Sequence, residues 1–252
     1  MRKFFVSLNQ LNENKINIIG EDVNHIKNVL RCEIGEKLDI CIEENGTNYL
    51  CKIEEISKEY ILCDVIEEIE SKAESNVQLT IYQGLPKSDK MELIIQKCTE
   101  LGVKRIVPVE MDRSIVKLVG KDEAKKIERW QKIAEMAAKQ SKRDLIPEIS
   151  HLENIKKICE NLEKYDIVFV AYEDEDKTYL KQELRNLDKI ENPKIAVVIG
   201  PEGGFDTKEI NTLKESGAKI VTLGKRILRT ETAPITLASI IMYELGDIGG
   251  TI

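Results

Sequence analysis

The amino-acid sequence predicts an α/β fold, in which a small strand-rich domain precedes a larger domain built on a parallel sheet. Short runs of alternating apolar and polar residues fill positions 1 to about 72, as in half-buried antiparallel strands. From residue 77 onward, continuous runs rich in Val and Ile alternate with amphipathic helices, as in a parallel sheet covered on both faces. The polar stretch 67–76 separates the two patterns, so we expect one domain at 1–72 and a second at 73–252.

The N-terminal domain is predicted to be a small β-barrel. Its alternating runs are separated by turn signals at Gly35 and at Asn45-Gly46, and one helix is expected at about 22–30. Short strands of this kind bury a core when the sheet closes on itself. The expected strands lie at 1–6, 15–19, 38–42, 49–53 and 60–66.

The C-terminal domain is predicted to contain strands alternating with helices that have clear start and stop signals. Gly102 and Gly217 are expected to end two helices, and Thr232 is expected to cap the last helix, with Pro234 in its first turn. Asp and Glu three residues apart have the spacing of a capping box. Such boxes are expected at 89–92 and 206–209, and strands at 77–82, 105–109, 167–171, 195–199 and 220–223.

The composition is that of an acidic chain whose charge is unevenly distributed. A net charge of −7 disfavours nucleic acid as a ligand, because phosphate contacts need basic surfaces. Residues 112–144, however, hold ten basic and six acidic side chains, whereas residues 54–74 hold eight acidic and two basic ones. One face of the molecule can therefore be basic enough to contact nucleic acid. The alternative for 121–142 is an ordinary solvated helix face.

Several kinds of site and location are disfavoured by what the sequence lacks. No apolar run approaches the ~18 residues of a membrane span, and the N-terminus has no signal-peptide pattern. The six cysteines form no Cys-x-x-Cys motif and the two histidines lie far apart, so we expect no metal site. The cysteines are expected to be reduced core thiols of a cytoplasmic protein.

Two glycine-rich turns near the C-terminus are the strongest functional signal in the chain. The first, Gly-Pro-Glu-Gly-Gly-Phe at 200–205, follows the apolar run 195–198, and the second begins at Leu223-Gly224. Because ligands of open α/β sheets bind outside the carboxyl ends of the strands, the turns predict a small-molecule pocket. Neither turn is a Walker loop or a dinucleotide fingerprint, and the Glu202 carboxylate would repel a pyrophosphate. The alternative is that the glycines only reverse the chain.

These motifs resemble the RsmE family of small-subunit ribosomal RNA (uridine-N3) methyltransferases, which belong to the SPOUT class. The resemblance rests first on the 200–205 turn and on Leu-Gly-Lys-Arg-Ile-Leu-Arg-Thr-Glu-Thr-Ala at 223–233. Lys139 departs from the family, which usually has Glu at this position. Further matches bring the resemblance to nearly the whole chain; they are His25 with Val-Leu-Arg at 29–31, the helix at 90–103, Gln140-Ser141, Arg143 and Pro147.

The resemblance implies a PUA-like N-terminal domain that contacts RNA and a trefoil-knotted SPOUT domain that binds S-adenosylmethionine (SAM). It also implies a homodimer, and as substrate a uridine of 16S ribosomal RNA in the assembled 30S subunit. The expected cofactor contacts are Gly200, Glu202, Gly203, Leu223, Gly224, Ile227, Leu228 and Thr232. The expected RNA contacts are Arg2, His25, Lys27, Arg31, Arg113 and Arg143.

Methylation at uridine N3 requires the loss of a proton, so the site needs a base or a group that stabilises the uridinate anion. A guanidinium suits the second task, because it stays charged and donates in a planar fork. Arg229 is favoured since it lies in the second turn, and Arg226 is the next choice. Glu231 and Glu202 are the candidate bases. The alternative for Glu231 is a helix-start carboxylate that interacts with the helix dipole.

Two other classes of function remain open on the sequence alone. One is an RNA-binding module with a degenerate second domain, which the intact Arg-Thr-Glu-Thr-Ala run disfavours. The other is a nucleotide-hydrolysing or nucleotidyl-transfer enzyme, which the missing phosphate loop disfavours.

Overall fold

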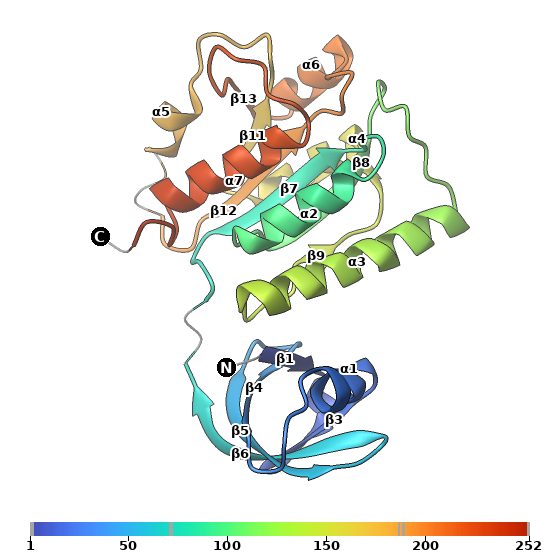
Figure 1. The fold of residues 1–252 in the computed structure, drawn as a ribbon. Coiled ribbons are helices and arrows are strands. Elements are labelled where there is room, and N and C mark those ends of the chain that lie inside the picture. Colours follow the sequence, from blue (N-terminus) through green and yellow to red (C-terminus); the bar gives the residue numbers. More distant parts are fainter. Residues whose placement is uncertain (1–2, 71–72, 186, 188–189, 251–252) are drawn as a thin grey trace. The chain divides into compact units, whose positions relative to one another are not determined.

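The structure is a computed structural model that describes residues 3–70, 73–185, 187 and 190–250 (Figure 1). It divides into two compact units, one of residues 1–74 with 138–146 and one of residues 75–137 with 147–252. Residues 138–146 thus pack with the N-terminal unit although they lie in the middle of the chain.

The N-terminal unit is a curled six-stranded sheet in the order β1-β4-β5-β6-β3-β2. Only β1 and β4 pair in parallel, and the remaining pairs are antiparallel. The predicted strand-rich domain is therefore confirmed, with β1 and β2 as the edges of the described sheet. The strands are β1 (Lys3–Val6), β2 (Leu11–Asn12), β3 (Lys15–Ile19), β4 (Lys37–Ile42), β5 (Asn48–Ile56) and β6 (Tyr60–Ile69).

The core of this unit consists of the inward positions of its strands. Ile16 and Ile18 of β3 alternate with exposed neighbours and are fully buried, as period-2 patterning requires. The single helix predicted at 22–30 is an α-helical turn, α1 (Glu21–Asn24), that continues as the π-helical turn η2 (His25–Val29). A short 3-10 helix, η1 (Leu8–Gln10), follows β1.

The C-terminal unit is built on a seven-stranded parallel sheet in the order β10-β8-β7-β12-β11-β13, with β9 beside β8. This confirms the predicted α/β class, and every strand that the Val/Ile runs predict is present. The trefoil knot stays a prediction of the resemblance. The strands are β7 (Gln78–Gly84), β8 (Arg105–Glu110), β9 (Glu148–Ile149), β10 (Glu153–Asn154), β11 (Ile167–Ala171), β12 (Lys194–Ile199) and β13 (Lys219–Val221).

Helices cover both faces of this sheet (Figure 1). α2 (Lys90–Glu100) packs against α7 (Thr232–Glu244) on one face, and α4 (Ile155–Glu160) packs against α6 (Thr207–Glu215) on the other. The apolar runs are continuous because both faces of the strands are buried in this way. The other helices are α3 (Lys121–Ser141), α5 (Leu180–Leu184) and the 3-10 turn η3 (Leu162–Lys164).

One of the three predicted N-terminal helix caps is confirmed. Asp206 and Glu209 form the capping box of α6. At α2 the box is wrong, because Asp89 lies near φ −88°, ψ 11° rather than in the extended conformation of a cap, and Glu92 instead pairs with Arg129. Thr232 is also not a cap: the chain is already helical at Glu231, so Thr232 is the first residue of α7.

The state of the cysteines and the character of the helices can be compared with the expectations of reduced thiols and no membrane span. No disulfide joins the described cysteines, and burial raises the pKa of the Cys51, Cys63 and Cys98 thiols to about 12. These side chains are therefore protonated core thiols at neutral pH. In the part of the chain that the structure describes, no helix is long and apolar enough to cross a membrane.

Candidate functional site

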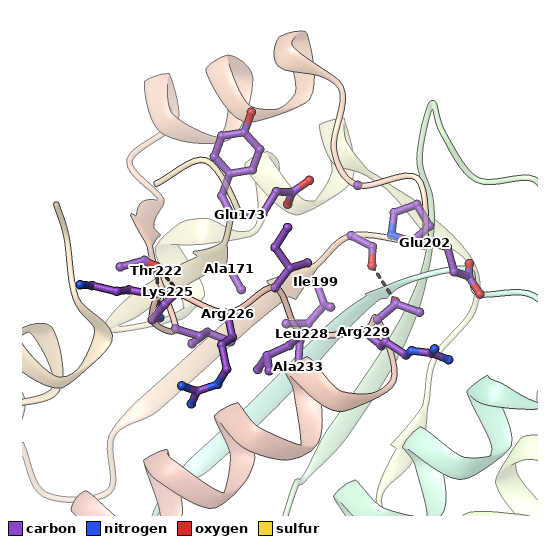
Figure 2. Close-up of a pocket in the computed structure, with 18 of the residues that line it drawn as sticks. Ala171, Glu173, Ile199, Glu202, Thr222, Lys225, Arg226, Leu228, Arg229 and Ala233 are labelled. Atoms are coloured by element: carbon purple, nitrogen blue, oxygen red, sulfur yellow. Dashed lines mark hydrogen bonds between the residues drawn. The ribbon is translucent and has the colours of Figure 1, made fainter. Parts of the chain in front are cut away.

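A cavity of about 430 Å³ lies at the carboxyl ends of β11, β12 and β13 (Figure 2). Three loops wall it: residues 171–173 after β11, the first glycine turn after β12, and residues 222–230 after β13. Lys90 of α2 and Ala233 of α7 complete the lining. Its size and its position at the strand ends are those of a small-molecule site, as the two turns predict.

The first glycine turn is tightly packed. A Cβ atom on Gly200 would lie 3.2 Å from the ring of Phe205, and one on Gly203 would lie 3.0 Å from Cβ of Arg113. Gly204 has φ +69°, and a Cβ there would clash with the Glu173 carboxylate. Glycine is needed here because neighbouring protein atoms occupy the space of a side chain. The turn forms a fixed floor to the cavity.

The second loop is open. Gly224 has φ +120°, which favours glycine, and no protein atom lies within 4 Å of its Cβ position. Ile227 is 84% exposed, and Lys225 and Arg226 are exposed beside it. Among the described residues, the backbone N–H and C=O groups of 225–228 make no hydrogen bond to protein. This stretch therefore presents backbone donors and acceptors that a heteroaromatic ring with polar edges can bind.

A buried polar network joins the two turns to the sheet. The Thr230 hydroxyl donates to the Gly200 carbonyl at 2.7 Å, and Nε2 of Gln83 donates to that hydroxyl at 3.0 Å. Gln83 lies near the end of β7 and is fully buried, and Thr230 is buried as well. Bonds of this kind in a low-dielectric interior fix the relative positions of the groups that they join.

A charged cluster lies at one end of the cavity. Lys90 Nζ is 2.9 Å from Oε1 of Glu202 and 3.2 Å from Oε2 of Glu231. Burial raises the pKa of both carboxyls, but the Lys90 ammonium and nearby backbone N–H groups outweigh burial and hold each pKa below its usual value. Both side chains are therefore ionised at neutral pH, and a carboxylate with a depressed pKa is a weak base.

The two candidate arginines lie on the same loop but extend in different directions. Figure 2 shows Arg229 reaching toward the end of the cavity that holds Glu202, while Arg226 points away from that end. Both side chains are exposed, and both residues line the cavity. Neither has an ion pair shorter than 4 Å within the described chain, so each guanidinium is available to a substrate.

Most of the residues predicted for the site come together. Gly203 belongs to the first turn but packs against Arg113 and does not line the cavity. Glu231 contacts the site through Lys90, and Thr232 lies outside it at the start of α7. Lys90 and Glu173 were not predicted, because their neighbours in the site are far away along the chain. The predicted residues that line the cavity are Gly200, Glu202, Leu223, Gly224, Arg226, Ile227, Leu228 and Arg229.

The predicted RNA contacts have different surroundings. His25, Lys27 and Arg31 are exposed on the N-terminal unit, and Arg113 donates to the Gly203 carbonyl at 3.2 Å behind the first turn. Arg143 is only 3% exposed and pairs with Glu74 at 2.7 Å, so its guanidinium stabilises the N-terminal unit and is not presented to RNA. Arg2 lies outside the described residues.

Lys139 and the predicted lack of a metal site are the remaining points to compare with the structure. Lys139, where the resembled family usually has Glu, pairs with Asp22 at 3.1 Å within the N-terminal unit. Among the residues that the structure describes, no three His, Cys, Asp or Glu side chains gather as a metal site.

Comparisons with known proteins agree with the geometry. Residues 73–242 match the model of an RNA methyltransferase domain, and residues 18–66 match that of an RNA methyltransferase PUA domain. A Bacillus subtilis protein named ribosomal RNA small subunit methyltransferase E is 38% identical over 252 residues, which cover 97% of each chain.

Two solved structures are similar over nearly their whole length. One is a ribosomal RNA small subunit methyltransferase E from Neisseria gonorrhoeae bound to S-adenosyl methionine (28% identity, TM-score 0.85, 98% of this chain and 99% of that one). The other is a methyltransferase described as putative, from Legionella pneumophila, with bound SAM (29% identity, TM-score 0.85, 98% of each chain).

Proposed function

The chain belongs to the ribosomal RNA small subunit methyltransferase E family, and from this premise we propose that it methylates N3 of one uridine in 16S ribosomal RNA. The methyl donor is SAM, and the substrate is the assembled 30S subunit. One observation carries the assignment of the site: the cavity between the two glycine turns combines a packed floor with an open wall of unpaired backbone groups.

The residues present fit SAM. Adenine is recognised by backbone N–H and C=O groups, which residues 225–228 leave unpaired beside the cavity, with Leu223, Ile227 and Leu228 as apolar surface. The carboxylates of Glu202 and Glu173 favour a cationic ligand over a pyrophosphate. When bound, SAM supplies an electrophilic methyl group on a sulfonium. The chain's own residues must then place the uridine in line with that methyl and stabilise the charge that develops on the base.

Arg229 is the proposed catalytic residue. Its exposed guanidinium belongs to the loop that walls the cavity and can stabilise a uridinate anion at N3. Arg226 is the second candidate, since it points elsewhere. Glu231 and Glu202 are weaker candidates for a base because Lys90 keeps both ionised with depressed pKa values. Electrostatic stabilisation by Arg229 is therefore favoured over proton abstraction by a carboxylate.

The N-terminal domain, 1–72, is proposed to dock the RNA, and residues 73–252 to carry out methyl transfer. His25, Lys27 and Arg31 are exposed and suit phosphate contacts, and Arg113 lies beside the first turn. Uridine N3 is buried in a base pair, so the target base must be unpaired or flipped out. Arg143 is left out of this set because its charge is paired in the interior.

We also propose a homodimer in the cytoplasm. α7 is apolar on more than one side: Leu237 and Ile241 are buried within the chain, whereas Tyr243 is 66% exposed and Ile235 is half-buried. A helix that is apolar all round normally has partners on all sides. Sedimentation is expected to give twice the mass of one chain. The cytoplasmic location rests on the buried thiols.

The test is methylation with tritiated SAM, using 30S subunits and naked 16S RNA in parallel, followed by nucleoside mass analysis. N3-methyluridine on the 30S subunit is the expected product. Calorimetry in excess chelator is expected to show saturable SAM binding. Transfer to another position or another RNA, or SAM binding that needs a metal, would contradict the proposed function.

A further inference from the structure

We propose that Lys90 is a positioning residue of this site, whose ammonium ties the two glycine turns to each other and so sets the width of the cavity. The inference rests on the proposed function for the identity of the ligand, SAM, while the contacts themselves come from the structure.

Lys90 connects three elements that are far apart in the sequence. It is the first residue of α2, Glu202 belongs to the turn after β12, and Glu231 directly precedes α7. Its Nζ lies 2.9 Å from one carboxylate and 3.2 Å from the other. The turn before α2 adds a second contact, because the backbone N–H of Lys87 donates to Glu202 at 3.1 Å. The floor and the open wall of the cavity are thus joined at one nitrogen atom.

A lysine suits this position because both partners carry the same charge. Two carboxylates that approach one point repel each other unless a cation lies between them. An ammonium has three donors on a compact charge and can serve two acceptors at once. The charged groups that face the cluster are Lys90, Glu202, Glu231 and Arg229, which also attracts Glu231. Removing Lys90 leaves the two carboxylates facing each other across the cavity mouth.

The second loop is the part that depends on this contact. Its backbone between residues 225 and 228 has no hydrogen bonds to protein in the described structure, so it is held only at its ends. Thr230 fixes one end from inside, through Gln83 and the Gly200 carbonyl, and the Lys90–Glu231 pair fixes the same end from the solvent side. Loss of the outer contact lets the wall move away from the floor.

The expected effect is on SAM binding more than on the chemical step. Lys90→Met is expected to weaken SAM binding roughly tenfold, because it removes both ion pairs of a side chain that is only 30% exposed and is therefore partly shielded from solvent. Lys90→Arg keeps the charge and is expected to restore most of the affinity. Lys97→Met is the matched control, because Lys97 lies on the same helix and, among the described residues, forms an ion pair only with Glu100.

The decisive readout is the pH dependence of SAM affinity, measured by calorimetry from pH 8 to about pH 3. The affinity ratio of wild type to Lys90→Met is expected to be largest at neutral pH, where both carboxylates are ionised. It is expected to shrink only below the usual glutamate pKa of about 4.3, as the pH falls through the depressed pKa values of the two carboxyls. A side chain that only fills space would give the same ratio at every pH.

Glu202→Gln provides a second route to the same test if Lys90→Met fails to fold. It is expected to weaken SAM binding by itself. The double variant Glu202→Gln/Lys90→Arg is expected to lose no more SAM-binding free energy than the sum of the losses of the two single variants. The proposal is overturned if Lys90→Met binds SAM as wild type does at pH 7, or if its defect is the same at all pH values. Absence of SAM binding by the wild type would instead contradict the proposed function.

Discussion

The two glycine turns of the C-terminal unit differ in how tightly protein atoms pack around their glycines. In the turn after β12, neighbouring protein atoms lie where side chains on Gly200, Gly203 and Gly204 would go. In the loop after β13, the Cβ position of Gly224 faces open space and residues 225–227 are exposed. The packed turn needs glycine for space and, at Gly204, also for its backbone conformation, whereas the open loop needs it at Gly224 for backbone conformation alone.

This difference divides the work of the site between the turns. The packed turn provides a fixed surface, with its outgoing helix held by the Asp206–Glu209 capping box. The open loop provides the groups that meet ligands: unpaired backbone between 225 and 228 and the guanidinium of Arg229. Changes in the first turn should therefore affect stability, and changes in the second should affect binding and catalysis.

The largest effect is expected from Arg229→Ala in the open loop. It removes the cation that stabilises the uridinate, and loss of one such contact in a desolvated site costs about 2.7–4 kcal/mol, or about 10²–10³ in rate. Turnover under saturating SAM is the measurement. SAM affinity and RNA affinity are expected to change little, and raising the pH should partly restore the rate because uridine then ionises unaided.

Arg226→Ala is the matched control for that change, since it removes a second exposed arginine from the same loop. Its effect on turnover is expected to be much smaller. A rate for Arg229→Ala within about threefold of wild type at neutral pH would show that Arg229 is not catalytic, and Arg226 would then be the next candidate.

The next largest effect is expected from Gly84→Ala, which overpacks the fixed turn. The new Cβ would lie 2.7 Å from both Cδ and the backbone nitrogen of Pro201, and neither atom can move away without moving the turn. Overpacking of this kind costs about 1–3 kcal/mol in the free energy of unfolding. Urea unfolding, followed through the single tryptophan Trp130, measures it.

Ile227→Ala is the corresponding change in the open loop, with the free energy of unfolding measured in the same way. Because this side chain is 84% exposed, the free energy of unfolding should change by less than about 0.5 kcal/mol. Equal losses of stability in Gly84→Ala and Ile227→Ala would abolish the distinction between the two turns.

A smaller effect is expected from Thr230→Val, which keeps the shape of the side chain but removes its hydroxyl. The Gly200 carbonyl and the Gln83 amide each lose a buried hydrogen bond, at a cost of about 1–2 kcal/mol in unfolding free energy. SAM affinity should fall as well, because this network aligns the open loop with the fixed turn. Thr230→Ser, which keeps the hydroxyl, should retain most of both; equal defects in the two variants would argue against the network.

The smallest effect is expected for the dependence of folding stability on pH. The pKa values of Glu202 and Glu231 are depressed in the folded chain, so their ion pairs stabilise it fully above the unfolded value of about 4.3. That contribution is lost as pH falls through the folded values. Between pH 6 and 8 these two carboxyls stay ionised, so they should not change the free energy of unfolding in that range. In Glu202→Gln, the stability deficit seen at pH 7 should diminish by pH 3.5, and a deficit that persists unchanged would contradict the ionised pair.

The sequence predicted the sheet and both turns well because these features depend on local patterns. β11 has the bounds that its Val/Ile run predicts, since a strand buried on both faces must be apolar throughout. The Asp206 box is also local and was predicted correctly, whereas the box at Asp89 failed because the backbone there is not extended.

The charged and buried groups of the site could not be predicted in the same way. Lys90 has the sequence context of an ordinary helix start, and its role depends on Glu202 and Glu231, which the fold brings to it. Arg143 has the context of a basic surface segment, yet it is buried and forms an ion pair with Glu74. Pairings between residues distant in the chain leave no periodic or spacing signal in a single sequence.

Amide hydrogen exchange of the chain, with and without saturating SAM, tests the division between the turns most directly. The N–H groups of Gly204 and Asp206 are already hydrogen-bonded to Pro201 and Glu209, so exchange at 200–206 should change little. Exchange at 225–228 should slow markedly, because SAM would supply acceptors that this part of the open loop lacks. If calorimetry shows that SAM binds, but amide exchange slows only at 200–206, the assignment of the open loop as the ligand-binding wall is contradicted.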